Sequence, residues 1–138
     1  MRTLKQLAEQ VRDGSPLEIE LGDFLDAFYR RPTTEAVCDE PALLSEAYPH
    51  GLIINAFLAA TAEHLCRRFS LPIPNWVFKR CRYLEQPYFA LKAPSFRATL
   101  LLESPVEFRS RNLFVTANAL SRASELSTEI TESRIPVG

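Results

Sequence analysis

Apolar residues dominate the middle of the chain. From Leu52 to Leu65 the only polar residues are Asn55, Thr61, Glu63 and His64, and neither Pro nor Gly interrupts the run. Frequent alanine favours a helix, and a helix that is apolar around nearly its whole circumference is typical of the centre of a domain. At about 14 apolar-rich residues, it is shorter than the roughly 20 that span a bilayer. We therefore predict a buried central helix over residues 51–69 and no membrane segment.

The N-terminal pattern predicts two amphipathic helices. Apolar residues recur at helical spacing over residues 3–12, and Gly14 is placed to end that helix. Ser15-Pro16-Leu17-Glu18 has the form of a capping box, and the helix that it opens is expected to reach about Tyr29. The apolar positions expected to face inward on these two helices are Leu4, Leu7, Ala8, Val11, Leu17, Leu21, Phe24, Leu25 and Phe28.

Shorter helical segments are expected around the central helix. Pro72 and Pro74 exclude a helix over residues 70–74, and aromatic residues on either side of residue 80 are expected to cover the core. Ser95 is placed to cap a helix over residues 96–103. The remaining short helices are expected at residues 34–38, from Pro41 to about Ala47, from Ser104-Pro105 onward, and from Asn112 or Thr116 to about Ala123.

These elements together predict an all-α fold, a single-domain irregular helical bundle around the central helix, over residues 1–123. Residues 124–138 are rich in Ser, Thr and Glu and poor in apolar residues. This composition is typical of a disordered tail, and the alternative is a segment that becomes ordered on a partner.

Charge is segregated along the chain although the net charge is only −1. Residues 1–65 carry 11 Asp and Glu against 5 Lys and Arg, whereas residues 66–123 carry 10 Lys and Arg against 3 Glu. Such asymmetry can indicate an acidic partner or nucleic acid. The simpler interpretation is that the acidic helices pair with the basic segments inside the fold.

The sequence shows no catalytic, metal or cofactor motif. The three cysteines, Cys38, Cys66 and Cys81, have irregular spacing, which fits reduced thiols in the cytoplasm better than a disulfide framework. We expect Cys66 and Cys81 to be small core residues and His64 to be a partly buried, hydrogen-bonded histidine. No paired Cys or His spacing supports zinc, and no glycine-rich phosphate loop is present, so we expect no cofactor.

Basic residues interleaved with aromatic ones run through residues 79–122. Lys79, Arg80, Arg82 and Arg97 suit single-stranded nucleic acid, which binds through phosphate contacts and base stacking. Against this interpretation, the pI near 6.1 is low for a dedicated nucleic-acid binder, and no helix-turn-helix pattern is present. Nucleic-acid binding is therefore the alternative function.

One pattern of residues extends over about residues 74–123. It consists of Pro74-x-Trp76, Pro87-x-Phe89, Ser95-x-Arg97-Ala98, Ser104-Pro105-x-x-Phe108-Arg109-x-Arg111-Asn112-x-Phe114-Val115 and Leu120-x-Arg122-Ala123. With this pattern, the segment resembles one in uncharacterised bacterial helical proteins. Those proteins are similar to accessory or antitoxin-like partners of nucleotidyltransferase-type toxins, some of which carry a DNA-binding domain in front. The resemblance implies a protein partner and no catalytic residue; this chain shows no such N-terminal DNA-binding pattern.

We therefore predict a non-enzymatic protein–protein interaction module in the cytoplasm, antitoxin-like or an accessory partner of a bacterial enzyme. Trp and Arg dominate the energetics of many interfaces. The predicted partner contacts are accordingly Trp76, Arg109, Arg111 and Arg122. The N-terminus has no continuous apolar stretch of the kind found in a signal peptide, which favours the cytoplasm.

Overall fold

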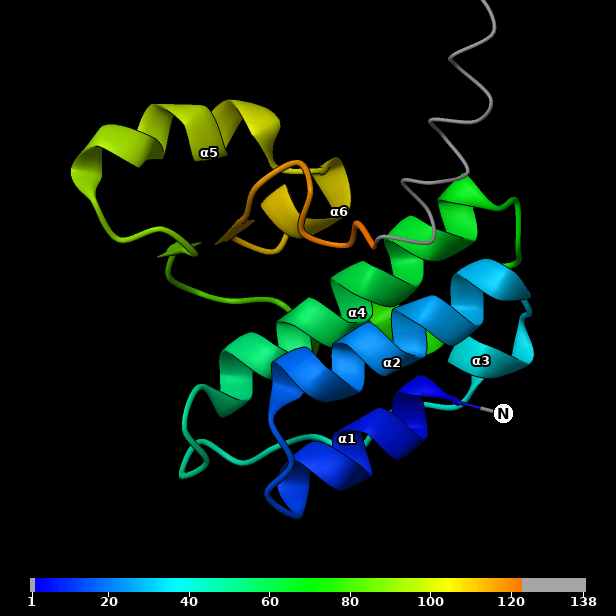
Figure 1. Cartoon of the computed structure of the whole chain (residues 1–138). Coiled ribbons are helices and arrows are strands. Elements are labelled where there is room, and N and C mark those ends of the chain that lie inside the picture. Colours follow the sequence, from blue (N-terminus) through cyan, green and yellow to red (C-terminus); the bar gives the residue numbers. More distant parts are fainter. Residues whose placement is uncertain (1, 123–138) are drawn as a thin grey trace, which may run out of the picture.

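The chain is mainly helical in the computed structural model, which describes residues 2–122 (Figure 1). The all-α class expected from the sequence is confirmed as a mainly-α fold, which also contains a short two-stranded sheet. The predictions for the tail, residues 124–138, fall outside the described residues. The elements in chain order are α1 (Leu4–Arg12), α2 (Leu17–Arg30), α3 (Glu35–Cys38), α4 (Gly51–Arg68), the 3₁₀ turns η1 (Asn75–Phe78) and η2 (Arg80–Arg82), β1 (Tyr88–Phe89), η3 (Pro94–Phe96), α5 (Arg97–Glu103), α6 (Val106–Arg109) and β2 (Leu113–Phe114).

Helices α1 and α2 pack on each other with the inward faces that their periodicity predicts. Thr3 caps α1 because its side chain accepts a hydrogen bond from the Gln6 backbone N–H, while the Gln6 side chain accepts one from the Thr3 backbone N–H. The capping box predicted at the start of α2 is wrong. Pro16 is the N-cap there, and Ser15 instead donates its hydroxyl to Glu20 at 2.7 Å.

Helix α4 is buried over most of its length. Between Ile54 and Cys66, only Phe57 and His64 keep partial exposure. Helix α6, the turns η1 and η2, and strand β2 all pack against α4, and Phe28 of α2 contacts Phe69 at the C-terminal end of α4. At the N-terminus of α4, Gly51 lies so close to the Ser45 carbonyl that a Cβ would collide with that oxygen. The turn that leads into α4 therefore requires glycine.

The helix predicted from Pro41 to Ala47 is wrong, because this segment is held in an irregular conformation by α4. The Asn55 side chain accepts from the Leu44 N–H and donates to the Leu44 carbonyl, both at 2.9 Å. Leu44 is thereby fixed in the core, although the local sequence alone favours a helix there. A side-chain amide that satisfies both backbone groups competes directly with helical hydrogen bonding.

The last predicted helix, from Asn112 or Thr116, is also wrong. Residues 113–114 form β2, which pairs in parallel with β1 so that Tyr88 opposes Leu113 and Phe89 opposes Phe114. Asn112 adopts a left-handed conformation with φ of 63°, and its side chain donates to the Leu84 carbonyl at 2.8 Å. The backbone conformation at Asn112 therefore depends on a partner that lies 28 positions away in the sequence.

Residues 90–103 form an arm between the two strands. The chain leaves β1, makes η3 and α5, and returns through Ser104, whose hydroxyl bonds the Leu100 and Val115 carbonyls and accepts from the Val115 N–H. Ser95 does not cap α5, which begins at Arg97 directly after η3. Among the described elements, the main packing partner of α5 is η3, its neighbour in sequence. The arm is therefore joined to the body mainly at its two ends.

Candidate functional site

Trp76 and Arg82 are structural residues of the core. Trp76 is 6% exposed and donates its indole N–H to the Val37 carbonyl at 3.0 Å. The Arg82 guanidinium lies 4.9 Å from the centre of the Trp76 ring, and Arg82 itself has no exposed surface. It binds the Pro41 carbonyl at 2.6 Å and the Glu40 carboxylate at 3.0 Å. Neither side chain is available to a partner of the folded chain.

Arg111 is also completely buried. It donates to the Glu63 carboxylate at 2.8 Å and to the carbonyls of Glu107 and Val77, each at 2.7 Å. Its guanidinium lies 4.6 Å from the centre of the Tyr83 ring. Arg111 thus joins α4 to the segments on either side of it. The sequence-based role of Arg111 as an exposed partner contact does not fit this position.

Lys79 and Arg122 are exposed in part, and both are paired with acidic residues of the N-terminal half. Arg122 donates two hydrogen bonds of 3.0 Å to the Asp26 carboxylate, and this contact lowers the pKa of the Asp26 carboxyl. Lys79 binds Glu40 at 2.6 Å. Burial alone would raise the pKa of Glu40, but hydrogen bonds from Lys79 and Arg82 lower it overall. These pairs join the acidic and basic halves of the chain inside the fold. They agree with the simpler interpretation of the charge pattern.

Of the eight predicted contact residues, only Arg80, Arg97 and Arg109 are exposed without a carboxylate partner in the described part of the chain. Arg97 lies against Phe89, and Arg109 makes one long contact of 3.4 Å with the Leu101 carbonyl. The structure brings Trp76 and Arg82 together inside the core, and Lys79 meets Arg82 at the Glu40 carboxylate. The basic surface expected over residues 79–122 is therefore much reduced.

His64 takes part in a charged network beside Arg111. Its Nδ1 lies 2.9 Å from a Glu107 carboxylate oxygen, as the expectation of a hydrogen-bonded histidine required. Arg67 holds the second oxygen of Glu63 at 2.7 Å. Both carboxylates of the network are nearly buried and already have cationic or imidazole partners. Such a network fixes the packing of α4 on α6.

The cysteines do not assemble with other potential metal ligands. In residues 2–122 no group of three His, Cys, Asp or Glu side chains is arranged to hold a metal ion. Cys66 lies in the core as expected, and burial raises the pKa of its thiol to about 11. Cys81 is exposed, contrary to expectation, because the neighbouring Arg82 takes the inward position of η2.

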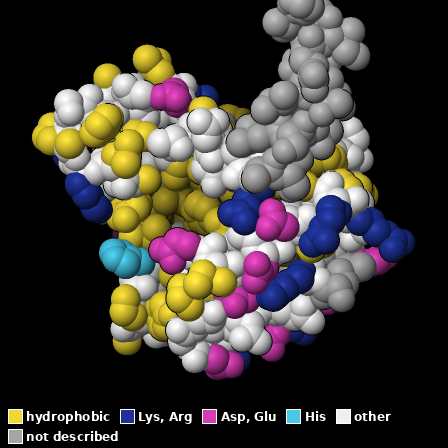
Figure 2. Space-filling view, viewed as in Figure 1, with side chains coloured by type: hydrophobic (Ala, Val, Ile, Leu, Met, Phe, Trp, Pro, Cys, Tyr) yellow, Lys and Arg dark blue, Asp and Glu magenta, His cyan; other side chains and the backbone are white. Residues whose placement is uncertain are grey.

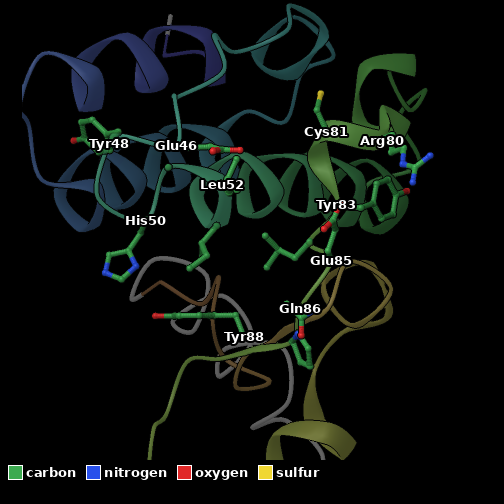
Figure 3. A pocket seen from close by; sticks show the side chains of 14 residues that line it. Glu46, Tyr48, His50, Leu52, Arg80, Cys81, Tyr83, Glu85, Gln86 and Tyr88 are labelled. Atoms are coloured by element: carbon green, nitrogen blue, oxygen red, sulfur yellow. The ribbon is translucent and has the colours of Figure 1, made fainter.

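A hollow of about 830 Å³ opens between the start of α4 and the segment that leads to β1 (Figure 3). Leu52 and Tyr88 point into it from opposite sides, and His50 lies at its edge, with its ring 6.3 Å from that of Tyr88. Glu46 and Glu85 add two carboxylates. The hollow is thus lined mainly by apolar and aromatic surface with polar groups around it.

Large apolar side chains are exposed along the arm next to this hollow. In residues 2–122, nine large hydrophobic side chains are exposed, and five of them fall between residues 91 and 106. Figure 2 shows hydrophobic atoms both over α5 and in the hollow beneath it. We call these residues the apolar arm surface. They are Leu91, Phe96, Leu101 and Leu102 on the arm and Val106 just beyond it at the start of α6, and they are 39%, 46%, 44%, 82% and 57% exposed.

Sequence reasoning missed this surface, although a signal for it was present. Leu100, Leu101 and Leu102 are consecutive, and adjacent residues on a helix point about 100° apart. Only one of the three can face inward, and the structure selects Leu100. Leu100 does not even belong to the main core cluster, so the arm has little interior of its own.

Comparison with protein-family models, with curated proteins and with solved structures found no match for this chain. None of the helices in residues 2–122 is long and apolar enough to cross a membrane.

Proposed function

We propose that this chain is a protein-binding module that engages its partner through the apolar arm surface and the adjoining hollow. The observation that carries the proposal is the exposure of five large apolar side chains on a 16-residue stretch, led by Leu102 at 82%. Burying one such side chain is worth about 1.5–3 kcal/mol. Apolar surface gathered in one region is typical of an interaction site, whereas single exposed residues need no explanation.

The test is site-specific photocrosslinking in the cells that produce the chain. A photoreactive amino acid replaces Leu102 in one version and Ile19 in another; Ile19 is also exposed, at 59%, but lies on α2. The proposal expects one discrete adduct from position 102 and none from position 19. Equal adducts at both positions, or none at position 102, would contradict it.

The narrower form of the proposal is an antitoxin-like or accessory partner of a bacterial enzyme, in the cytoplasm. The resemblance of residues 74–123 supports it, and the arm lies inside that segment. The three free cysteines, two of them exposed, suit a reducing compartment. Co-expression with a candidate enzyme tests this form: the chain should suppress the activity of the enzyme, and its Leu102→Asp variant should not.

Nucleic-acid binding stays a prediction with weaker support. Arg82 is buried and Lys79 is paired, which leaves Arg80 and Arg97 from the four predicted contacts. A gel-shift assay at low salt checks it, because phosphate contacts give a steep dependence of affinity on salt.

A further inference from the structure

The charges on the arm are positive except for Glu103 at its C-terminal end. Between residues 86 and 102 the chain carries Lys92 and Arg97 but no Asp or Glu. Both side chains are exposed, and among the described residues neither has a carboxylate partner. The Lys92 ammonium lies 4.1 Å from the centre of the Tyr88 ring, and the Arg97 guanidinium lies 5.2 Å from that of Phe89. The rings of β1 therefore hold both cations at the end of the arm that joins β1.

These cations stand next to apolar positions in the sequence. Lys92 follows Leu91 and Arg97 follows Phe96, while Arg109 stands one helical turn beyond Val106 at the other end. A surface of this kind is complementary to a segment whose apolar residues are flanked by carboxylates. Charge pairs around an apolar centre select a partner and its orientation more than they add affinity.

We infer that the arm and the hollow bind an acidic amphipathic segment of another protein. This inference rests on the proposed function, which says only that the arm binds a protein. Glu46 and Glu85 line the hollow, but the arm itself is free of carboxylates up to Glu103. A segment seated along the arm therefore meets positive charge. Nucleic acid binds through phosphates and through bases that stack on aromatic rings, whereas Leu101 and Leu102 are aliphatic.

The test selects binders from a phage-displayed library of random 18-residue segments, with the full chain as bait. Each selected segment is then measured against three variants of the bait. The first, Leu102→Ser, removes an apolar contact. The second, Lys92→Glu/Arg97→Glu, reverses the charge of the arm. The third, Lys5→Glu/Arg12→Glu, makes the same change of net charge on exposed residues of α1 and is the matched control.

The expected binders carry Asp or Glu beside Leu, Ile or Phe, and they lose affinity with Leu102→Ser. Charge reversal on the arm should weaken them about tenfold at low salt, whereas the control should change affinity less than twofold. The tenfold difference should shrink at high salt, because exposed charges are screened.

The other outcomes separate this inference from the proposed function. Binders that depend on Leu102 but are neutral or basic would overturn the acidic partner and leave the protein-binding function in place. A selection with no Leu102-dependent binder would overturn both. Residues 123–138 of the chain themselves contain Glu125, Glu129 and Glu132. If changing these three to Gln makes the acidic segments bind more tightly, the occupant is the chain's own segment, and the separate partner is overturned.

Discussion

The guanidinium of Arg111 reaches the Glu63 carboxylate on α4 and the main chain at Val77 and Glu107. Its burial was not foreseeable from the sequence, because Glu63 is 48 positions away and Arg109 and Arg111 look equivalent in a polar stretch. The two arginines nevertheless have opposite environments, since Arg109 is exposed and Arg111 has no exposed surface.

We expect Arg111→Ala to lower the free energy of unfolding by about 3 kcal/mol, because it leaves the Glu63 charge and two carbonyls buried without this partner. Arg109→Ala should change it by less than about 0.5 kcal/mol. Denaturant titration measures both. The double variant Arg111→Met/Glu63→Gln should recover part of the loss, because it also removes the buried Glu63 charge, for which Arg67 would be the remaining partner among the described residues. If Arg111→Ala behaves like Arg109→Ala, the buried network does not stabilise the fold.

At the scale of elements, α4 and α5 use leucine in opposite ways. Leu58 on α4 has no exposed surface, whereas Leu102 on α5 is 82% exposed. We expect Leu58→Ala to lower the free energy of unfolding by about 2–5 kcal/mol through lost contacts and a cavity. The same deletion at Leu102 should cost less than about 0.5 kcal/mol. A large loss at Leu102 would show that α5 packs on the body and would count against an open binding surface.

The sequence predicted well those elements whose conformation follows from the spacing of their own apolar residues. Periodicity located α1 and α2, and the long apolar run located α4. The failures lie where a distant residue decides the backbone. Asn55 draws residues 41–45 out of a helix, and pairing with β1 makes residues 113–114 a strand. The apolar arm surface was missed because exposure depends on what packs above a residue, which periodicity does not report.

At the scale of the molecule, the acidic and basic halves are joined by ion pairs that cross the sequence. Asp26 meets Arg122 across 96 positions, and Glu40 meets Lys79 across 39. The pairing holds the folded-state pKa values of Asp26 and Glu40 below their ordinary values of 3.8 and 4.5. Near and below pH 4 the unfolded chain therefore binds more protons than the folded chain, so stability falls as the pH falls.

We expect the free energy of unfolding to decrease as the pH is lowered from 5 towards 2, and Asp26→Asn should make this decrease shallower. Asp23→Asn is a suitable control, because Asp23 is exposed, makes a 3.4 Å contact with Arg2 and acts on Arg122 through its charge without a hydrogen bond to it. Denaturant titrations at a series of pH values give the slopes. Identical slopes for all three proteins would show that the Asp26–Arg122 pair contributes nothing to acid stability.

The parallel pairing of β1 and β2 and the hydrogen bond from Ser104 to Val115 hold together the two ends of residues 90–103. The sequence between these two strands can diverge without disturbing the interior, because none of residues 90–103 belongs to the main core cluster. A different loop grafted between the same two anchor points would leave the body folded while presenting new chemistry to its surroundings. The proposed binding surface and the helical body are thus separable parts of this protein, and a change in the first does not require a change in the second.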